Sequence, residues 1–94
     1  MRYVLKLFVT GKGSVSVEAL ISVKRLCEDE LTSRYELRII DVLKEPELAE
    51  LEEIETTPTL IREEPGPVRR IVGDLSDRDR IRAGLQLDEG ARKI

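Results

Sequence analysis

The sequence predicts an α/β fold in the order βαβαββα, a mixed sheet with helices on both of its faces. Three observations support this prediction. A nearly continuous apolar run at residues 3–9 is typical of an inner strand that is covered on both faces. A helical repeat and a second strand follow, which implies a crossover and parallel pairing. Two β-prone runs then flank a proline-rich turn, and a last helix ends the fold.

The first strand covers residues 3–9, where only Lys6 interrupts the apolar side chains. Residues 10–14 break the strand, and either Ser14 or Ser16 is expected to cap the helix that follows. Apolar residues recur in this helix at spacings of three and four and form one buried face: Leu20, Val23, Cys27 and Leu31. The helix is expected to end within residues 31–34.

A second strand is predicted over residues 35–42, because apolar and charged residues alternate there before Ile40 and Val42. Pro46 then stands at a favourable first position for a short acidic helix. Three residues give this helix a modest apolar stripe: Leu48, Leu51 and Ile54.

Residues 57–61 and 68–72 are expected to form a β-hairpin around Pro65-Gly66-Pro67, because proline fixes φ and glycine permits a positive φ. Pro58 fits a strand start or an edge strand, where its missing N–H is tolerated. Ser76 is expected to open the last helix, with Asp79 three residues on in an approximate capping box. This helix covers residues 77–87, and the tail at 88–94 carries no strong signal.

The order βαβαββα is the thioredoxin arrangement, in which a cis proline precedes the third strand. Thr57-Pro58 occupies that place. Both isomers remain open from the residues alone, since only about 5 to 6% of X-Pro bonds in folded proteins are cis. The 94 residues are expected to form one domain over 1–94, long enough for a single aliphatic core.

Composition narrows the possible functions. The net charge of −3 gives the long-range field the wrong sign for general binding to nucleic acid or to anionic membranes. No apolar run approaches the roughly 20 residues of a membrane helix. A single cysteine and the lack of a signal-like segment lead us to expect a cytoplasmic protein without disulfides.

The residue content argues against catalysis, so we expect no enzyme, no cofactor and no metal. A thioredoxin-type enzyme needs a thiolate where the first strand turns into the first helix, but residues 11–14 read Gly-Lys-Gly-Ser. Cys27 lies on the apolar helix face and is expected to be a small buried side chain. Histidine, the commonest general base and zinc ligand, does not occur in the chain. The carboxylates of residues 45–55 fit a solvated helix face or a contact with a partner.

Three arginines of the hairpin stand out against this acidic background: Arg62, Arg69 and Arg70. Because side chains alternate along a strand, only one of Arg69 and Arg70 can share a face with a given neighbour. The arginines protect an edge strand from aggregation or dock onto an acidic partner surface. The residues leave both interpretations open.

Several segments resemble the KaiB family of circadian clock proteins, in register over residues 3–87. They are residues 3–9 (YVLKLFV), 40–44 (IDVLK), 57–60 (TPTL), 67–71 (PVRRI), 73–76 (GDLS) and 84–85 (GL). Departures from the family pattern are Glu18 in place of a basic residue, Gln86 in place of an acidic one, and Gly66 in place of a proline.

The resemblance implies a fold-switching protein. Its resting form, a tetramer or dimer, would order the elements as βαββααβ, whereas a thioredoxin-like monomer would bind the hexameric ATPase KaiC. The bound form would help to capture KaiA and would compete with the kinase SasA. The resemblance also implies a partner surface and two fold-switch positions: Arg38, Arg62, Arg69 and Arg70 for the surface, and Pro58 and Gly84 for the switch. A diverged, sensor-type KaiB paralogue without a complete oscillator is the alternative.

Gly84 has its own physical argument. Glycine in a helix interior costs roughly 0.5 to 1 kcal/mol relative to alanine. Replacing it with alanine is therefore expected to favour the thioredoxin-like form.

Overall fold

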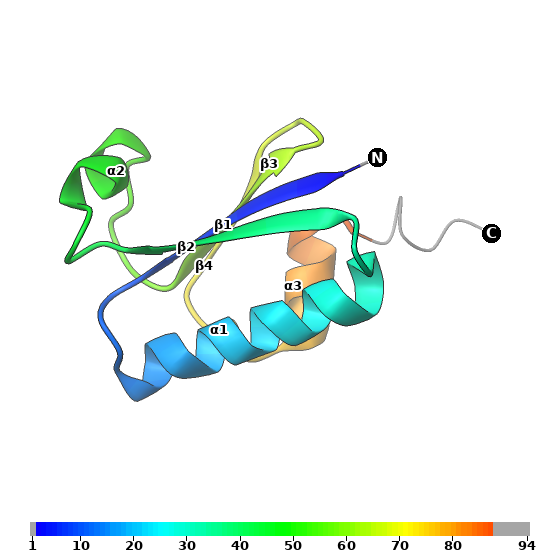
Figure 1. The fold of residues 1–94 in the computed structure, drawn as a ribbon, viewed down its shortest axis with the longest axis horizontal. Coiled ribbons are helices and arrows are strands. Elements are labelled where there is room, and N and C mark those ends of the chain that lie inside the picture. The colour runs from blue at the N-terminus through cyan, green and yellow to red at the C-terminus, as the bar shows by residue number, and fades with distance from the viewer. Residues whose placement is uncertain (1, 88–94) are drawn as a thin grey trace.

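The computed structural model describes residues 2–87, and Figure 1 shows their arrangement. The elements in chain order are β1 (Tyr3–Val9), α1 (Ser14–Leu26), the π-helix η1 (Cys27–Leu31), β2 (Tyr35–Asp41), α2 (Pro46–Leu51), β3 (Thr59–Glu64), β4 (Arg69–Val72) and α3 (Arg78–Leu85). This order confirms the predicted βαβαββα fold. Among the helices of residues 2–87, none has the length and apolar character needed to cross a bilayer.

The four strands form one mixed sheet in the order β2-β1-β3-β4. β1 pairs in parallel with β2 and antiparallel with β3, and β3 pairs antiparallel with β4. The first strand is therefore an inner strand, as its apolar sequence predicts. α1 and α3 cover one face of the sheet and α2 lies on the other (Figure 1). We call these the two-helix face and the α2 face.

The two faces carry separate cores of unequal size. The larger core joins the inward side chains of β1, such as Leu5 and Leu7, to α1 and α3. The smaller core consists of Phe8, Ile40 and Ile61, with Leu48 and other half-buried residues packed against it. Because α2 is only six residues long, it covers one end of its face and leaves the remaining sheet surface to charged side chains.

The start of α1 differs from the prediction, because neither serine caps the helix. Gly13 occupies the N-cap position without a side-chain hydrogen bond, and Ser14 is already the first helical residue. The buried Ser16 donates its hydroxyl to the carbonyl of Thr10 at 3.0 Å. This serine therefore fastens the preceding loop to the helix rather than capping the helix. The predicted apolar face is otherwise buried, apart from the half-buried Leu20.

α2 confirms Pro46 in the first helical turn but corrects the predicted stripe. Leu51 is 78% exposed. The helix ends at this residue, and Ile54 reaches the smaller core from the loop beyond it, next to Leu48. The predicted stripe of Leu48, Leu51 and Ile54 required one continuous helix through residue 54. Because the helix ends at Leu51, the prediction that Leu51 is buried was wrong.

The predicted hairpin is present, but its first strand begins two residues later than expected. Leu60 pairs with Ile71 in the antiparallel ladder of β3 and β4. Thr57-Pro58 precedes β3 and its peptide bond is cis, as are the X-Pro bonds before Pro65 and Pro67. The carbonyl of the buried Pro58 accepts a hydrogen bond from the N–H of Gly73 at 3.0 Å.

α3 is capped by a different residue from the one predicted. The Asp77 carboxylate accepts hydrogen bonds from the backbone N–H groups of Asp79 and Arg80, at 3.0 and 3.2 Å. Ser76 instead donates its hydroxyl and its N–H to Asp74, at 2.6 and 2.9 Å. Ser76 and Asp77 are both residues that can cap a helix. Because Ser76 is bound to Asp74 in the preceding turn, Asp77 is the cap of α3.

One prediction concerns Asp41 at the end of β2, whose carboxylate accepts the N–H groups of Gly11 and Leu43 at 3.0 and 2.9 Å. These hydrogen bonds hold the pKa of Asp41 below its usual value, and the bond from Gly11 has the largest effect. A lowered folded-state pKa stabilises the fold above the unfolded pKa, and this stabilisation disappears as the pH falls through the folded pKa. Asp41→Ala should therefore lower the free energy of unfolding at pH 7.

The measurement is urea unfolding of the parent and of Asp41→Ala from pH 7 down to pH 3. The difference between the two proteins should shrink as the pH falls, because the parent loses the same interaction by protonation. Glu47→Gln, at an exposed site on α2, is the control and should show no such convergence. A difference that stays constant over this range would contradict the assignment.

Candidate functional site

Three basic side chains lie in one row across the α2 face. Arg38 of β2 lies beside Lys6 of β1, which is paired with Ile61 of β3, and Ile61 is paired with Arg70 of β4. Three strand spacings of roughly 4.8 Å place the Cα atoms of Arg38 and Arg70 about 14 Å apart. The sheet therefore brings two arginines from opposite edges onto one surface, which we call the basic row (Arg38, Lys6 and Arg70).

The other two predicted arginines lie on the two-helix face. Arg62 pairs with Leu5 on one side and with Arg69 on the other. Arg69 and Arg70 therefore point to opposite faces, as strand alternation predicts. The four arginines that the resemblance implies do not form one patch in this fold.

Arg62 lies inside the protein, with 5% of its surface exposed. Its guanidinium donates to the carbonyl of Leu85 at 2.6 Å and to that of Pro67 at 3.1 Å. It thus joins the C-terminal end of α3 and the hairpin turn to β3, and its charge lies at the negative end of the α3 dipole. A partner contact by Arg62 remains a prediction, and it requires this interior to open. Arg69 beside it is half-buried.

Arg70 is exposed and differs from the other members of the basic row. Its guanidinium donates to the carbonyls of Glu52 and Glu53, at 2.7 and 3.4 Å, where α2 ends. Among residues 2–87 no carboxylate lies within ion-pair distance of Arg70. Its positive charge is therefore held in place by main-chain acceptors and is available to an acidic group of a partner.

The sequence prediction did not include Lys6 among the functional residues. A lysine within an otherwise apolar inner strand is unusual and could have indicated it. Its ammonium group lies 2.7 Å from Glu63 and 3.2 Å from Glu52. The pKa of Lys6 is raised, mainly by its hydrogen bond with Glu63, although burial lowers it. Arg38 in turn donates to Glu36 at 2.8 Å. The basic row therefore alternates with carboxylates, and Arg70 carries its least compensated charge.

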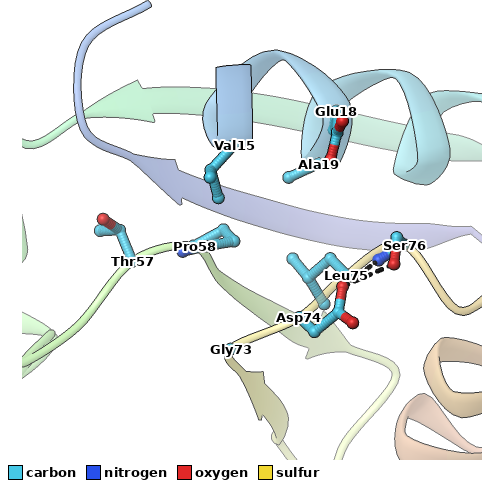
Figure 2. A pocket seen from close by; sticks show the side chains of 9 residues that line it. All are labelled: Val15, Glu18, Ala19, Thr57, Pro58, Gly73, Asp74, Leu75 and Ser76. Atoms are coloured by element: carbon cyan, nitrogen blue, oxygen red, sulfur yellow. Dashed lines mark hydrogen bonds between the residues drawn. The ribbon is translucent and has the colours of Figure 1, made fainter. Parts of the chain in front are cut away.

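A groove lies beside the start of α1, just after the turn at residues 11–14 where a thioredoxin-type enzyme would carry its reactive thiol. It has a volume of about 370 Å³ and runs between the first turns of α1 and the loops at Pro58 and 73–76. Figure 2 shows Val15 and Pro58 on its apolar side, with Glu18 and Asp74 also among its lining residues. The Asp74 carboxylate is bound by Ser76, whose hydroxyl is the first cause of its lowered pKa.

Cys27, the single cysteine of the chain, is far from being a nucleophile. Its side chain is 1% exposed in the larger core. Burial, and to a lesser extent the charge of Glu28, raises the pKa of its thiol to about 12. A thiol with this pKa is protonated at neutral pH, so it lacks the thiolate that attacks disulfides. Among the described residues, no group of three or more potential ligands is arranged to hold a metal ion.

Gly84 allows α3 to approach β4 closely. A Cβ atom built at this position would lie 2.7 Å from both Cγ1 and Cδ1 of Ile71. Separations this short require the neighbouring side chain to move. The expectation that alanine favours this fold counted the backbone entropy alone, and the contact with Ile71 adds a packing cost to it.

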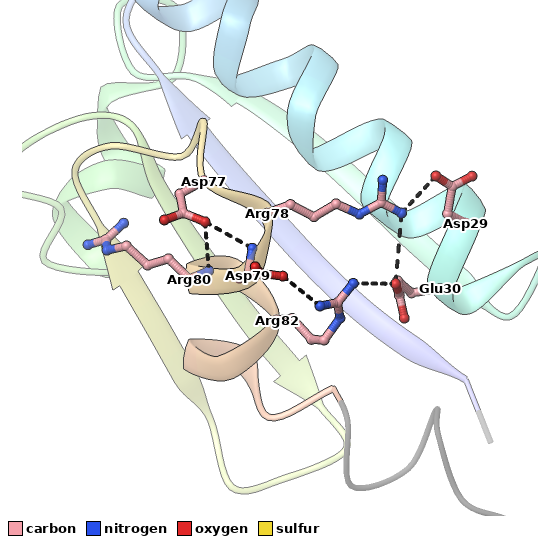
Figure 3. Close-up of polar contacts among 7 residues, drawn as sticks. All are labelled: Asp29, Glu30, Asp77, Arg78, Asp79, Arg80 and Arg82. Atoms are coloured by element: carbon pink, nitrogen blue, oxygen red, sulfur yellow. Dashed lines mark hydrogen bonds and ion pairs between the residues drawn. The ribbon is translucent and has the colours of Figure 1, made fainter.

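Ion pairs connect α3 to η1, and Figure 3 shows this α3–η1 cluster of Asp29, Glu30, Arg78 and Arg82. Arg78 lies 2.7 Å from Asp29 and 3.8 Å from Glu30, and Arg82 lies 2.6 Å from Glu30. The side chains of Glu30 and Arg82 are each 17% exposed, so water screens this pair less than the outer one. The cluster holds the C-terminal helix in its thioredoxin-like position.

The sequence of the chain matches known proteins closely. A family model described as the KaiB domain matches residues 6–87. The circadian clock oscillator protein KaiB of Rippkaea orientalis is 53% identical over 85 residues, which cover 90% of this chain and 82% of that protein. The KaiB of Prochlorococcus marinus MED4 is 51% identical over 85 residues, which cover 90% of this chain and 79% of that protein.

Solved structures show the same fold. The N-terminal domain of Synechococcus elongatus SasA has a TM-score of 0.74 and 29% identity, and the match covers 96% of this chain and 89% of that one. The thioredoxin Deadhead of Drosophila melanogaster has a TM-score of 0.71 and 20% identity, and the match covers 87% of this chain and 76% of that one. At this low identity the match supports a shared thioredoxin-like fold and nothing about function. The family model and the relatives together cover most of the sequence, and on this ground the chain belongs to the KaiB family.

Proposed function

We propose that this chain is a non-enzymatic regulator of a circadian clock, which binds a KaiC-like hexameric ATPase and modulates its phosphorylation cycle. The observation that carries the proposal is the identity of about half of all residues with curated clock proteins over 90% of the chain. The buried, protonated Cys27 supports a binding role over a redox role.

The basic row offers a docking surface for the ATPase. Arg70 presents a charge without a carboxylate partner among residues 2–87, and Arg38 is exposed at the opposite edge of the sheet. A surface of this kind fits an acidic patch, because complementary charge accelerates encounter and fixes orientation. Arg62 joins the interface only if the C-terminal elements move, since it is enclosed, and Arg69 lies on the opposite face of the sheet from the basic row.

Other clock proteins are further candidate partners. SasA carries an N-terminal domain of the same fold, and two proteins with one fold can compete for the same site. We therefore propose that this chain displaces a SasA-like protein from the ATPase and recruits a KaiA-like protein, acting in the cytoplasm.

A second packing belongs to the same proposal. We propose that the C-terminal half also adopts the βαββααβ order in a resting tetramer or dimer, with Pro58 and Gly84 as switch positions. Three described contacts hold the C-terminal elements in the thioredoxin-like form: the α3–η1 cluster, the hydrogen bonds of Arg62, and the contact of Gly84 with Ile71. A change of packing that moves α3 away from η1, β3 and β4 has to break all three.

The alternative function is that of a diverged KaiB paralogue, a thioredoxin-like interaction or sensor module in a host without a complete oscillator. The departures at Glu18 and Gln86 favour it. Glu18 lines the groove at Pro58, so its acidic charge alters a surface that the fold offers to partners. A monomer that binds no KaiC-like ATPase under any nucleotide condition would identify this alternative.

The test measures binding to a KaiC-like ATPase in the presence of ATP. Arg70→Glu should weaken the complex by about tenfold or more, because repulsion replaces attraction at a docking charge. Arg25→Glu is the matched control, since Arg25 is an exposed arginine on α1, away from the basic row. Binding should remain close to that of the parent in this variant.

Two results would count against the proposal. If Arg70→Glu binds as tightly as the parent, the basic row is not the docking surface. If the parent forms no complex with ATP present, the regulatory role itself is wrong.

A further inference from the structure

The groove beside the start of α1 has an apolar floor. Three of its lining residues are buried: Pro58, Ala19 and Leu75, of which the last two are 3% and 2% exposed. Val15 also lines the groove (Figure 2), and 62% of its surface is exposed. Covering Val15 would remove apolar surface from water, which favours binding. The groove therefore suits an apolar side chain of a partner.

Two carboxylates flank this floor from different walls. Glu18 comes from α1, and Asp74 comes from the loop after β4 (Figure 2). No lysine or arginine is among the described residues that line the groove. Glu18 is exposed, and no cation of residues 2–87 lies within ion-pair distance of it. Its negative charge is therefore open to a cation of a partner.

Asp74 keeps one carboxylate oxygen for a ligand. Its Oδ1 accepts both the N–H and the hydroxyl of Ser76, at 2.9 and 2.6 Å, which leaves Oδ2 for a further donor. Arg80 is the cation that acts on this carboxylate, and its charge has the smallest of the effects that lower the pKa of Asp74. The Arg80 guanidinium donates to the carbonyls of Val72 and Asp74. Arg80 thus serves main-chain oxygens and leaves most of the Asp74 charge uncompensated.

Hydrogen bonds fix the loops that form the walls. The N–H of Gly73 donates to the carbonyl of Pro58 at 3.0 Å, which joins the loop after β4 to the segment before β3. The hydroxyls of Thr10 and Thr57 lie 2.5 Å apart and join that segment to the loop before α1. A site that is formed in advance loses less conformational freedom on binding. The groove is therefore organised before a partner arrives.

A second hollow continues the groove beyond Thr57. It has a volume of about 320 Å³ and shares Thr57 with the groove, and Glu55 is the one charged residue among its described lining. Glu55 also borders Arg70, so we assign the recognition of charge to Glu18 and Asp74. Two hollows that meet at one residue suit an extended chain segment better than a compact small molecule.

From these observations we propose that the groove binds an extended segment of a partner protein in which lysines or arginines flank an apolar side chain. The apolar side chain lies over Pro58 and Leu75 and against Val15, and the basic side chains meet Glu18 and Asp74. Hydrogen bonds between charged groups of this kind are roughly twice as strong as neutral ones. The segment is opposite in charge to the acidic patch that suits the basic row. The proposal names a second surface and does not rest on the clock function.

The experiment selects ligands for the parent protein from a phage-displayed library of random nonapeptides. A variant with both Glu18→Lys and Asp74→Asn is used first to remove peptides that bind elsewhere. The selected peptides should be enriched in lysine, arginine and apolar residues. The most enriched peptide is then synthesised with a fluorescent label, and its affinity for the parent and the single variants is measured by anisotropy.

Glu18→Lys should weaken binding of this peptide by about tenfold or more, because repulsion replaces attraction. Asp74→Asn keeps an acceptor for Ser76 and should weaken binding by about threefold or more, since only the charge is lost. Val15→Ser, at an exposed position, should have a similar effect of about threefold through the lost apolar contact. These two mild substitutions carry the test if Glu18→Lys disturbs the fold.

Glu50→Lys is the charge-matched control, because Glu50 is exposed on α2, on the other face of the sheet from α1 (Figure 1). It should leave the affinity of the peptide within about twofold of the parent, as exposed charges outside a site contribute little. A selection that enriches no basic peptides overturns the proposal. So does a basic peptide that binds all three groove variants as tightly as the parent, or one that Glu50→Lys weakens as much as Glu18→Lys.

Discussion

Glu30→Lys is expected to detach α3 from η1. Glu30 lies 2.6 Å from Arg82 and 3.8 Å from Arg78, and its side chain is 17% exposed. In the variant a lysine faces two arginines in a partly desolvated position. Removing one partner of a buried pair costs about 3 to 5 kcal/mol, and partial exposure reduces this. We expect the free energy of unfolding to fall by about 2 to 3 kcal/mol, measured by urea denaturation.

Glu28→Lys is the matched control for this prediction, because Glu28 belongs to the same π-helix and is exposed. It should change the stability by less than about 1 kcal/mol, as exposed charges usually do. Amide exchange should accelerate in α3 of Glu30→Lys and leave β1 unaffected. Equal losses in the two variants would show that net charge matters here and the α3–η1 cluster does not. Under the proposed function, a resting packing that lacks the cluster would also make Glu30→Lys weaken binding to the ATPase.

Gly84→Ala is expected to destabilise the thioredoxin-like form, although alanine is the better helix residue. The helix gains roughly 0.5 to 1 kcal/mol from the substitution. The new methyl group meets Cγ1 and Cδ1 of Ile71 at 2.7 Å, and overpacking of a core typically costs about 1 to 3 kcal/mol. The packing term is larger, so the free energy of unfolding should fall.

A double-mutant cycle isolates the contact. Ile71→Ala removes both clashing atoms, so adding Gly84→Ala in that background should be neutral or stabilising. The coupling energy between the two sites should be about 1 to 3 kcal/mol, in the range known for residues in contact. Gly66→Ala is the control, because nothing lies within 4 Å of a Cβ atom at that glycine. Additive effects of Gly84→Ala and Ile71→Ala would show that α3 and β4 do not pack as described.

Hydrophobic periodicity accounts for most of what the sequence determined about this protein. The apolar run of β1, the three- and four-residue repeat of α1 and the alternation in β2 each predicted the right element, because burial selects the same residues that define the period. The position of Pro58 before β3 and the reversal at residues 65–67 followed from backbone chemistry that proline imposes locally. Element order and fold class follow from such short-range patterns.

Helix starts were predicted less well, because several neighbouring side chains can cap one helix. Ser76 and Asp77 are both good cap residues. Only the turn at Asp74, which binds Ser76, leaves Asp77 free to accept the N–H groups of α3. The same holds at α1, where Ser16 hydrogen-bonds the preceding loop.

The tertiary structure alone decided which side chains meet. The sheet register placed Lys6 between Arg38 and Arg70 and turned Arg62 into the interior. The α3–η1 cluster and the contact of Gly84 with Ile71 likewise depend on how α3 docks onto the sheet. A local period tells which face of an element is buried. The neighbour across that face is set by register and docking, which are properties of the whole assembled chain.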